Sequence, residues 1–148
     1  MGVGKLTSLE ICSSFMEVIL WHLLEPETEF LTHDVLCQRS QLGINSRDSS
    51  RYLKDVWDIC REKGCPNLAI MVINQRSKLP GDWYYDLYEA LYPTVRYQRG
   101  QRFKEEVEKV KSFLNWHELA QCYQLSESLI LQLSLRSLKL QQLQLKVV

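Results

Sequence analysis

The stretch from Arg51 to Tyr84 constrains the fold more than any other part of this sequence. It opens with apolar residues at helical spacing, which would place one side of a helix in the core. These residues are Leu53, Val56, Trp57 and Cys60. Gly64 can end that helix, and Pro66 prevents it from starting again. The sequence therefore predicts an amphipathic helix with a sharp stop at residue 64.

A strand-like segment follows this break. Leu68–Ile73 is an unbroken apolar run of strand length, so both faces of the strand should be covered. The segment 74–82 is polar and contains the turn signal Pro80-Gly81, and Trp83-Tyr84-Tyr85 then returns to residues with strand preference. Helix, strand, basic turn and strand in this order are typical of a winged helix-turn-helix domain.

Upstream of the break, the sequence predicts a series of helices. The first spans about residues 8–24, where apolar residues recur at helical spacing, and a turn at 25–28 follows it. The second is short, from Asp34 to Gln41, and the third begins behind the capping pair Asn45-Ser46. Because Gly43 lies between the second and third helices, we expect them to form a helix-turn-helix pair.

Aromatic and leucine-rich segments follow the turn. Six Trp and Tyr side chains crowd residues 82–97; they could stack on nucleobases, but a covering for the core is favoured, because Tyr commonly has one buried and one wet edge. A helix is expected over residues 101–115 and a short one over 117–124. The Leu- and Gln-rich tail at 125–148 fits helix and strand almost equally, and its composition favours the helix slightly.

Composition narrows the function classes. A chain of 148 residues suggests one domain with an extension, which we divide at residues 1–100 and 101–148. Net charge is zero, yet residues 31–80 carry eight basic and five acidic residues, which permits a nucleic-acid face without requiring one. Five cysteines without C-x-x-C spacing, and no signal peptide, predict reduced thiols in a cytoplasmic protein. No apolar run is long enough to span a bilayer.

The order and spacing of these segments resemble a known family. The matching positions run from Phe15-x-x-Val18, through Glu27-x-x-Phe30-Leu31-Thr32-His33-Asp34-Val35-Leu36 and Leu42-Gly43, to Arg51-Tyr52-Leu53-Lys54 and Gly64-x-Pro66. They are similar to the C-terminal domain of the alkylguanine-DNA alkyltransferases and alkyltransferase-like proteins. Over residues 15–85 the resemblance implies an α+β fold: a small winged helix-turn-helix-like domain with a short β-hairpin wing, followed here by C-terminal helices.

Alkyl transfer itself is not expected from this chain. The family's Pro-Cys-His-Arg motif would fall near Leu68–Val72, which reads Leu-Ala-Ile-Met-Val and carries neither thiol nor histidine. Transfer needs a thiolate with a base or a positive field beside it, and Cys65 lies before the predicted strand with no His adjacent. His33 replaces the family's turn Tyr, and Tyr52 and Leu53 replace its small residues. The resemblance therefore implies DNA docking without catalysis.

Other catalytic and ligand-binding patterns are missing from the sequence. The three His residues are not spaced as metal ligands, and no Cys/His group has zinc spacing. No nucleophile elbow, P-loop or dinucleotide-binding motif occurs. The acidic residues Asp55, Asp58 and Glu62 predict a solvated helix face and not a catalytic pair. We therefore expect a protein that is not an enzyme and that holds no metal or cofactor.

Two basic segments form the predicted DNA-binding site. A helix N-terminus offers backbone N–H groups to phosphate, Arg, Asn and Gln side chains can read base edges, and a basic turn can follow the backbone. The predicted DNA-binding residues are His33, Arg47, Ser50, Arg51, Lys54, Asn74, Gln75, Arg76 and Lys78. We expect duplex DNA to be bound through the helix at 46–63 and the turn at 74–82.

Two other interpretations stay open. Arg51 and Lys54 could pair with Asp48, Asp55 or Asp58 on a solvated helix face. Alternatively, the chain could be a protein-interaction module, or a small regulator or inhibitor of the kind that mobile elements encode, binding a protein partner through its aromatic and Leu-rich surface. The Leu-rich tail could also join two copies in a homodimer.

Overall fold

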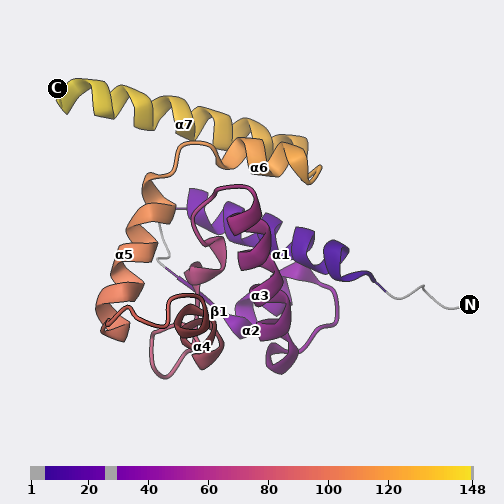
Figure 1. Cartoon of the computed structure of the whole chain (residues 1–148). Coiled ribbons are helices and arrows are strands. Elements are labelled where there is room, and N and C mark those ends of the chain that lie inside the picture. The colour runs from indigo at the N-terminus through magenta and orange to yellow at the C-terminus, as the bar shows by residue number, and fades with distance from the viewer. Residues whose placement is uncertain (1–5, 26–29, 148) are drawn as a thin grey trace, which may run out of the picture.

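A computed structural model describes residues 6–25 and 30–147 of the chain, and these residues are mostly helical (Figure 1). The helices are α1 (Ser8–Leu24), α2 (His33–Ser40), α3 (Ser46–Glu62), α4 (Asp82–Leu91), α5 (Arg99–Ser112), α6 (Trp116–Cys122) and α7 (Glu127–Val147). Between them lie the 3₁₀ helix η1 (Leu68–Met71) and the short strands β1 (Leu31–Thr32) and β2 (Val72–Ile73). The predicted turn at residues 25–28 lies largely outside the described residues.

The predicted β-hairpin wing is absent from the described chain, so the expectation of an α+β winged domain is wrong. Of the apolar run at 68–73, only Val72 and Ile73 form a strand. That strand pairs in parallel with β1, with Leu31 opposite Val72. The first part of the run coils into η1, because the Asn67 side chain caps it by accepting from the Ala69 N–H at 3.1 Å. A short apolar run fits a buried helical turn as well as a strand.

The second strand of the predicted wing is instead the start of α4. Apolar residues recur there at helical spacing, so one face of the helix is buried although Trp and Tyr prefer strands. The buried members are Trp83, Tyr84, Tyr85 and Tyr88. Tyr84 packs on Trp57 of α3, with 4.9 Å between ring centroids. This part of the tyrosine cluster therefore covers the core, and Tyr92 remains exposed.

The helices predicted upstream of the break are confirmed. Thr7 caps α1 by accepting from the Glu10 N–H, and Thr32 and Asn45 cap α2 and α3 in the same way. Residues 41–45 join α2 to α3 as the expected turn. Gly64 ends α3 in the left-handed region with φ of 70°, where the Cys65 N–H donates to the Cys60 carbonyl at 2.8 Å.

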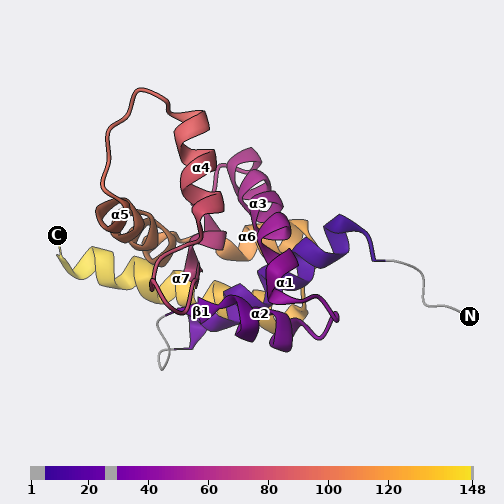
Figure 2. The same ribbon diagram turned by 90° about the horizontal axis from the view of Figure 1, so that it is seen from below.

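One hydrophobic cluster runs through the helices. It contains the core residues predicted for the third helix, Leu53, Val56, Trp57 and Cys60, together with Phe15 and Leu36, and Val18 is partly buried against it. Helices α6 and α7 lie together along one side of the molecule, and α2 and α4 lie on the other (Figures 1 and 2). The tail is thus helical, as its composition slightly favoured. The division at residue 100 remains a prediction.

Candidate nucleic-acid interface

A pocket of about 680 Å³ opens where the N-terminal ends of three helices meet the turn after β2. We call it the three-helix pocket. Its walls come from the start of α2 (Thr32, His33, Asp34), the start of α3 (Ser46, Arg47, Ser50), the turn (Asn74, Gln75, Arg76) and the start of α4 (Gly81, Asp82, Trp83). The fold thus brings together segments that are far apart in the sequence.

Most of the predicted DNA-binding residues line this pocket. They are His33, Arg47, Ser50, Asn74, Gln75 and Arg76. Arg51, Lys54 and Lys78 do not line it and are exposed on α3 and on the turn. The α4 part of the wall is not predicted from the sequence, because Pro80-Gly81 was interpreted as part of the turn and Trp83-Tyr84-Tyr85 as a strand. The signal was present: a Gly before an acidic residue and an apolar helical pattern is also a helix start.

The outer face of α3 carries a stripe of basic and polar side chains. Arg47, Ser50, Arg51 and Lys54 are spaced at i, i+3, i+4 and i+7, which places them on one side of a helix. The opposite side is buried through Val56 and Cys60, so the stripe faces outward. The Arg51 guanidinium donates to the Tyr52 hydroxyl at 2.6 Å and lies 4.8 Å from its ring centroid.

The alternative interpretation, in which acidic residues of α3 pair with its basic side chains, is met only in part. Asp58 forms its ion pair with Arg61, one turn toward the C-terminus. Asp48 and Asp55 lie near enough to Arg51 to raise the pKa of its guanidinium, although the hydrogen bond to Tyr52 is the larger cause. The Arg51 side chain remains exposed to solvent, so its charge is available to a ligand.

His33 forms a hydrogen bond with a buried serine. Its Nδ1 lies 2.7 Å from the Ser49 hydroxyl, and that hydroxyl donates its proton to the Ser46 carbonyl at 2.7 Å. A neutral His33 that donates from Nδ1 fits both contacts of this hydroxyl, with Nε2 as an acceptor. Burial lowers the pKa of His33, against a smaller opposite effect of Asp34. His33 is therefore neutral at pH 7 and adds no positive charge to the pocket.

The turn at 74–82 is stabilised by hydrogen bonds within the segment itself. The Asn74 N–H donates to the Leu79 carbonyl at 2.8 Å, and the Lys78 N–H donates to the Asn74 carbonyl at 2.9 Å. The Asn74 side-chain carbonyl accepts from the Arg76 N–H at 2.9 Å, so its predicted role in base recognition competes with a local one. Lys78 has φ of 60°. The closed turn fixes Arg76 at the wall of the three-helix pocket.

The pocket is electrostatically suited to anions. Helix N-termini carry partial positive charge and backbone N–H groups without helical partners. Arg47 and Arg76 add two cations, and of the two acids in the wall Asp82 is paired with Arg99 at 2.8 Å, outside the pocket. Asp34 is the exposed exception. The formal charges of the wall therefore balance, two cations against two acids, and the N–H groups at the helix N-termini are what favour an anion.

Four of the five cysteine thiols have raised pKa values. Burial raises the pKa of the Cys12 and Cys60 thiols to about 12, and burial also raises the pKa values of Cys37 and Cys65. A reactive thiol needs the opposite shift. No cluster of His, Cys, Asp or Glu among the described residues could hold a metal ion.

Comparisons with known proteins add no family. No family model, no curated protein and no solved structure matches this chain. The resemblance to the alkyltransferases therefore stays a hypothesis from the sequence. Among the described helices, none combines the length and the apolar character needed to cross a membrane.

Proposed function

We propose that this chain is a non-catalytic DNA-binding protein, which contacts duplex DNA through the N-terminal half of α3 and the turn at residues 74–82. The observation that supports this function is the convergence of two basic segments on the three-helix pocket: Arg47 and Ser50 of α3 line the same wall as Gln75 and Arg76 of the turn. Their chemistry suits phosphates and base edges.

The shape of α3 suits insertion into a groove. Its outer stripe is uncovered, and α2 packs against it from the N-terminal side in a helix-turn-helix arrangement. In such proteins the second helix enters the major groove with its N-terminal residues near base edges. Arg51 would then contact a base edge or a phosphate, and Arg76 and Lys78 would hold the flanking backbone.

We expect Arg51→Ala to weaken binding by about 1–3 kcal/mol if the contact is a base edge. Arg76→Ala and Lys78→Ala should weaken binding equally for every sequence and each reduce the salt slope by about one. All three side chains are exposed, so the thermal unfolding curve should not change. Fluorescence anisotropy with labelled duplexes at several salt concentrations measures both quantities.

Lys139→Ala is the matched control, because Lys139 is an exposed cation on α7, across the molecule from α2 and α4 (Figure 1). It should leave affinity and salt slope unchanged. If the wild-type chain shows no affinity for duplex DNA even at low salt, the basic stripe is only a solvated face and the proposal fails.

Absence of alkyl transfer is part of the same proposal. Incubation with duplex DNA that contains an O⁶-alkylguanine, followed by intact-mass measurement, should show no added alkyl group. The physical reason is that the raised pKa values of Cys60 and Cys65 keep both thiols protonated at neutral pH. Stoichiometric alkylation of Cys65 would contradict this expectation.

Protein binding is a second candidate function, favoured by the surface of α7. Several of its leucines are exposed, the largest fraction being 75% at Leu145. They are Leu131, Leu135, Leu138, Leu143 and Leu145. Exposed leucines in such number mark contact surfaces for a protein partner or a second copy. Association that is insensitive to salt would favour this function over DNA binding. For either function we propose a cytoplasmic location, consistent with five free thiols.

A further inference from the structure

A groove of about 540 Å³ runs between the end of α1 and the middle of α7. We call it the α1–α7 groove. Its apolar wall consists of Trp21, Leu23 and Leu24 of α1 and of Leu135 and Leu140 of α7. Leu135 is 43% exposed, and residues 141–145, where α7 continues past α6 (Figure 1), are exposed as well. The groove therefore offers apolar surface to the solvent, and surface of this kind commonly serves for contacts with a partner.

The polar part of the groove wall contains a half-buried cation, Arg136. Its guanidinium donates to the backbone carbonyls of Phe113, at 2.9 Å, and of Lys111. Burial lowers the pKa of Arg136, and among the described residues no acidic group opposes this shift. The two carbonyls satisfy N–H donors but leave the charge unbalanced. A carboxylate that enters the groove would therefore gain a charge-assisted hydrogen bond.

A second cation lies one turn further along α7. Lys139 lines the same groove and is exposed, and it takes no part in the ion pairs of the described residues. The acid that the described residues contribute to the wall is Glu25, which already lies 3.9 Å from Arg39. Cations of the groove thus outnumber its acids beside an apolar wall. A complementary occupant has apolar side chains on one side and carboxylates next to them.

A second copy of α7 does not match this pattern. The acidic residue of α7 is Glu127 at its start, far along the helix from Arg136 and Lys139. Two copies packed through this side of α7 would bring cations together without an acid between them, which is unfavourable. The shape of the site suits a helix, because a groove between two helices accepts a third whose apolar side chains recur at i, i+3, i+4 and i+7.

We propose that the α1–α7 groove binds an acidic amphipathic helix of a partner protein. The apolar side chains of that helix pack on Trp21 and Leu135, and its carboxylates pair with Arg136 and Lys139. DNA binding does not require this groove. The inference deepens the second candidate function, and it rests on that function in one respect, namely that α7 meets a protein.

The indole N–H resonance of Trp21 gives a direct test, because Trp21 lines the groove and donates to the Glu17 carboxylate at 2.7 Å. Trp21→Phe assigns the signal. The probe is a labelled helical peptide of about five turns, built from alanine, glutamate and a stripe of leucines, and the matched peptide has lysine in place of every glutamate. With the full-length protein and the acidic peptide, we expect a saturable shift of the Trp21 signal and a rise in anisotropy. The basic peptide should bind about tenfold more weakly or less.

Variants of the groove sharpen this test. Lys139→Glu should weaken binding of the acidic peptide about tenfold, since it turns an attraction into a repulsion. Leu135→Ser should weaken it as well, because apolar contact is lost. Both side chains are exposed, so the thermal unfolding curve should not change. Arg136→Gln removes the half-buried charge and should act in the same direction. Lys54→Glu, on the exposed side of α3, is the control and should leave peptide binding unchanged.

Three outcomes would overturn the inference. Equal binding of the two peptides, or binding of neither, would show that the groove selects no acidic helix. Self-association of the chain alone that Leu135→Ser abolishes, measured by sedimentation velocity, would assign the groove to a second copy. A saturable Trp21 shift with oleate and none with the acidic peptide would assign it to a fatty acid.

The outcomes for the proposed functions can be told apart from these. Lys139→Glu should leave the affinity for duplex DNA unchanged, so a failed peptide titration leaves DNA binding intact. Equal binding of both peptides, lost in Leu135→Ser, would overturn the acidic partner and still support protein binding through α7. Binding of the acidic peptide by a chain that has no affinity for DNA would support the inference and overturn the DNA-binding proposal.

Discussion

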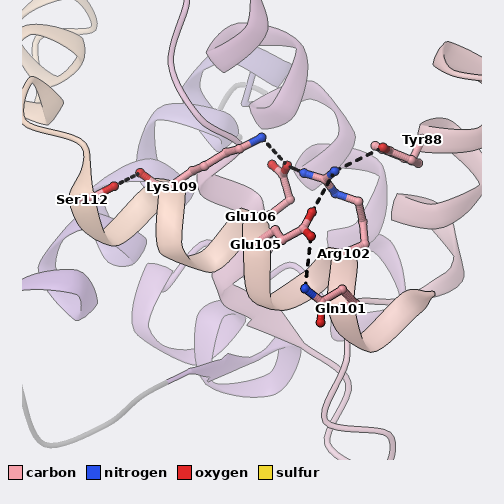
Figure 3. A network of polar contacts seen from close by, with 7 residues as sticks. All are labelled: Tyr88, Gln101, Arg102, Glu105, Glu106, Lys109 and Ser112. Carbon is pink, nitrogen blue, oxygen red and sulfur yellow. Dashed lines mark hydrogen bonds and ion pairs between the residues drawn. The ribbon is translucent and has the colours of Figure 1, made fainter. Parts of the chain in front are cut away.

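Replacing Arg102 with alanine is expected to lower the free energy of unfolding by about 3 kcal/mol, because the change leaves the buried Glu106 carboxylate with only the mostly exposed Lys109 as its cation. Arg102 of α5 belongs to the polar network that Figure 3 shows between α5 and Tyr88 of α4. Its guanidinium pairs with Glu106 and with Glu105, the latter at 3.3 Å, and donates to the Tyr88 hydroxyl at 3.3 Å. The side chains of Arg102 and Glu106 are 14% and 13% exposed, so water screens the pair weakly.

The same guanidinium also packs on an aromatic face. It lies 5.1 Å from the centroid of the Tyr88 ring, and Tyr88 is itself buried on α4. Lys109 contacts Glu106 at 3.2 Å from the next turn, where its own side chain is mostly exposed. Loss of Arg102 therefore removes two ion pairs, one hydrogen bond and one cation–π contact at the junction of two helices.

Urea unfolding followed by far-UV circular dichroism measures this loss. Arg99→Ala supplies the control on the same helix: its pair with Asp82 is 49% and 79% exposed, so less than about 1 kcal/mol should be lost. Glu106→Ala and the Arg102→Ala/Glu106→Ala double variant complete a cycle, in which the double variant should lose less than the sum of the two. Equal losses for Arg99→Ala and Arg102→Ala would show that the buried pair adds nothing.

Local rules predicted the helices of the first half well. Apolar spacing and the caps Thr7, Thr32 and Asn45 determine where α1, α2 and α3 begin, and both signals act within a few residues. The prediction of a wing was wrong because the local signals in its two segments are ambiguous. The run at 68–73 is too short for its period to distinguish strand from helix, and its strand partner, Leu31, lies far away in the sequence.

The sequence predicted those parts of the site that lie within a single segment, but not the contacts between segments. Arg47 and Arg76 could be proposed separately as basic residues on a helix and a turn, but their shared wall depends on how α2, α3 and α4 pack. The lowered pKa of His33 comes from its burial, which depends on the packing of other elements around it and not on a local pattern. The place of Trp83 in the pocket wall is not predicted from the sequence, because the strand expected at Trp83-Tyr84-Tyr85 would point alternate side chains to opposite faces.

Replacing Trp116 with alanine should cost about 3–5 kcal/mol, the usual loss for a large aromatic side chain in a core. Trp116 is fully buried where α5 turns into α6. Its Nε1–H donates to the Val110 carbonyl at 3.0 Å, and its ring centroid lies 4.8 Å from that of Phe113. Trp116→Phe keeps most of the volume and loses the hydrogen bond, so it should cost clearly less.

This variant also tests whether residues 101–148 unfold with the rest of the chain. The Glu17 carboxylate of α1 accepts from the Ser126 N–H at 2.9 Å and from the Ser126 hydroxyl at 2.6 Å, which ties the start of α7 to the first helix. Leu129 of α7 and Phe15 of α1 belong to the same hydrophobic cluster. We therefore expect Trp116→Ala to unfold in one transition that far-UV circular dichroism and tryptophan fluorescence report alike. A first transition that removes only part of the helical signal would instead make α5–α7 a separately folding unit, docked on a stable α1–α4 core.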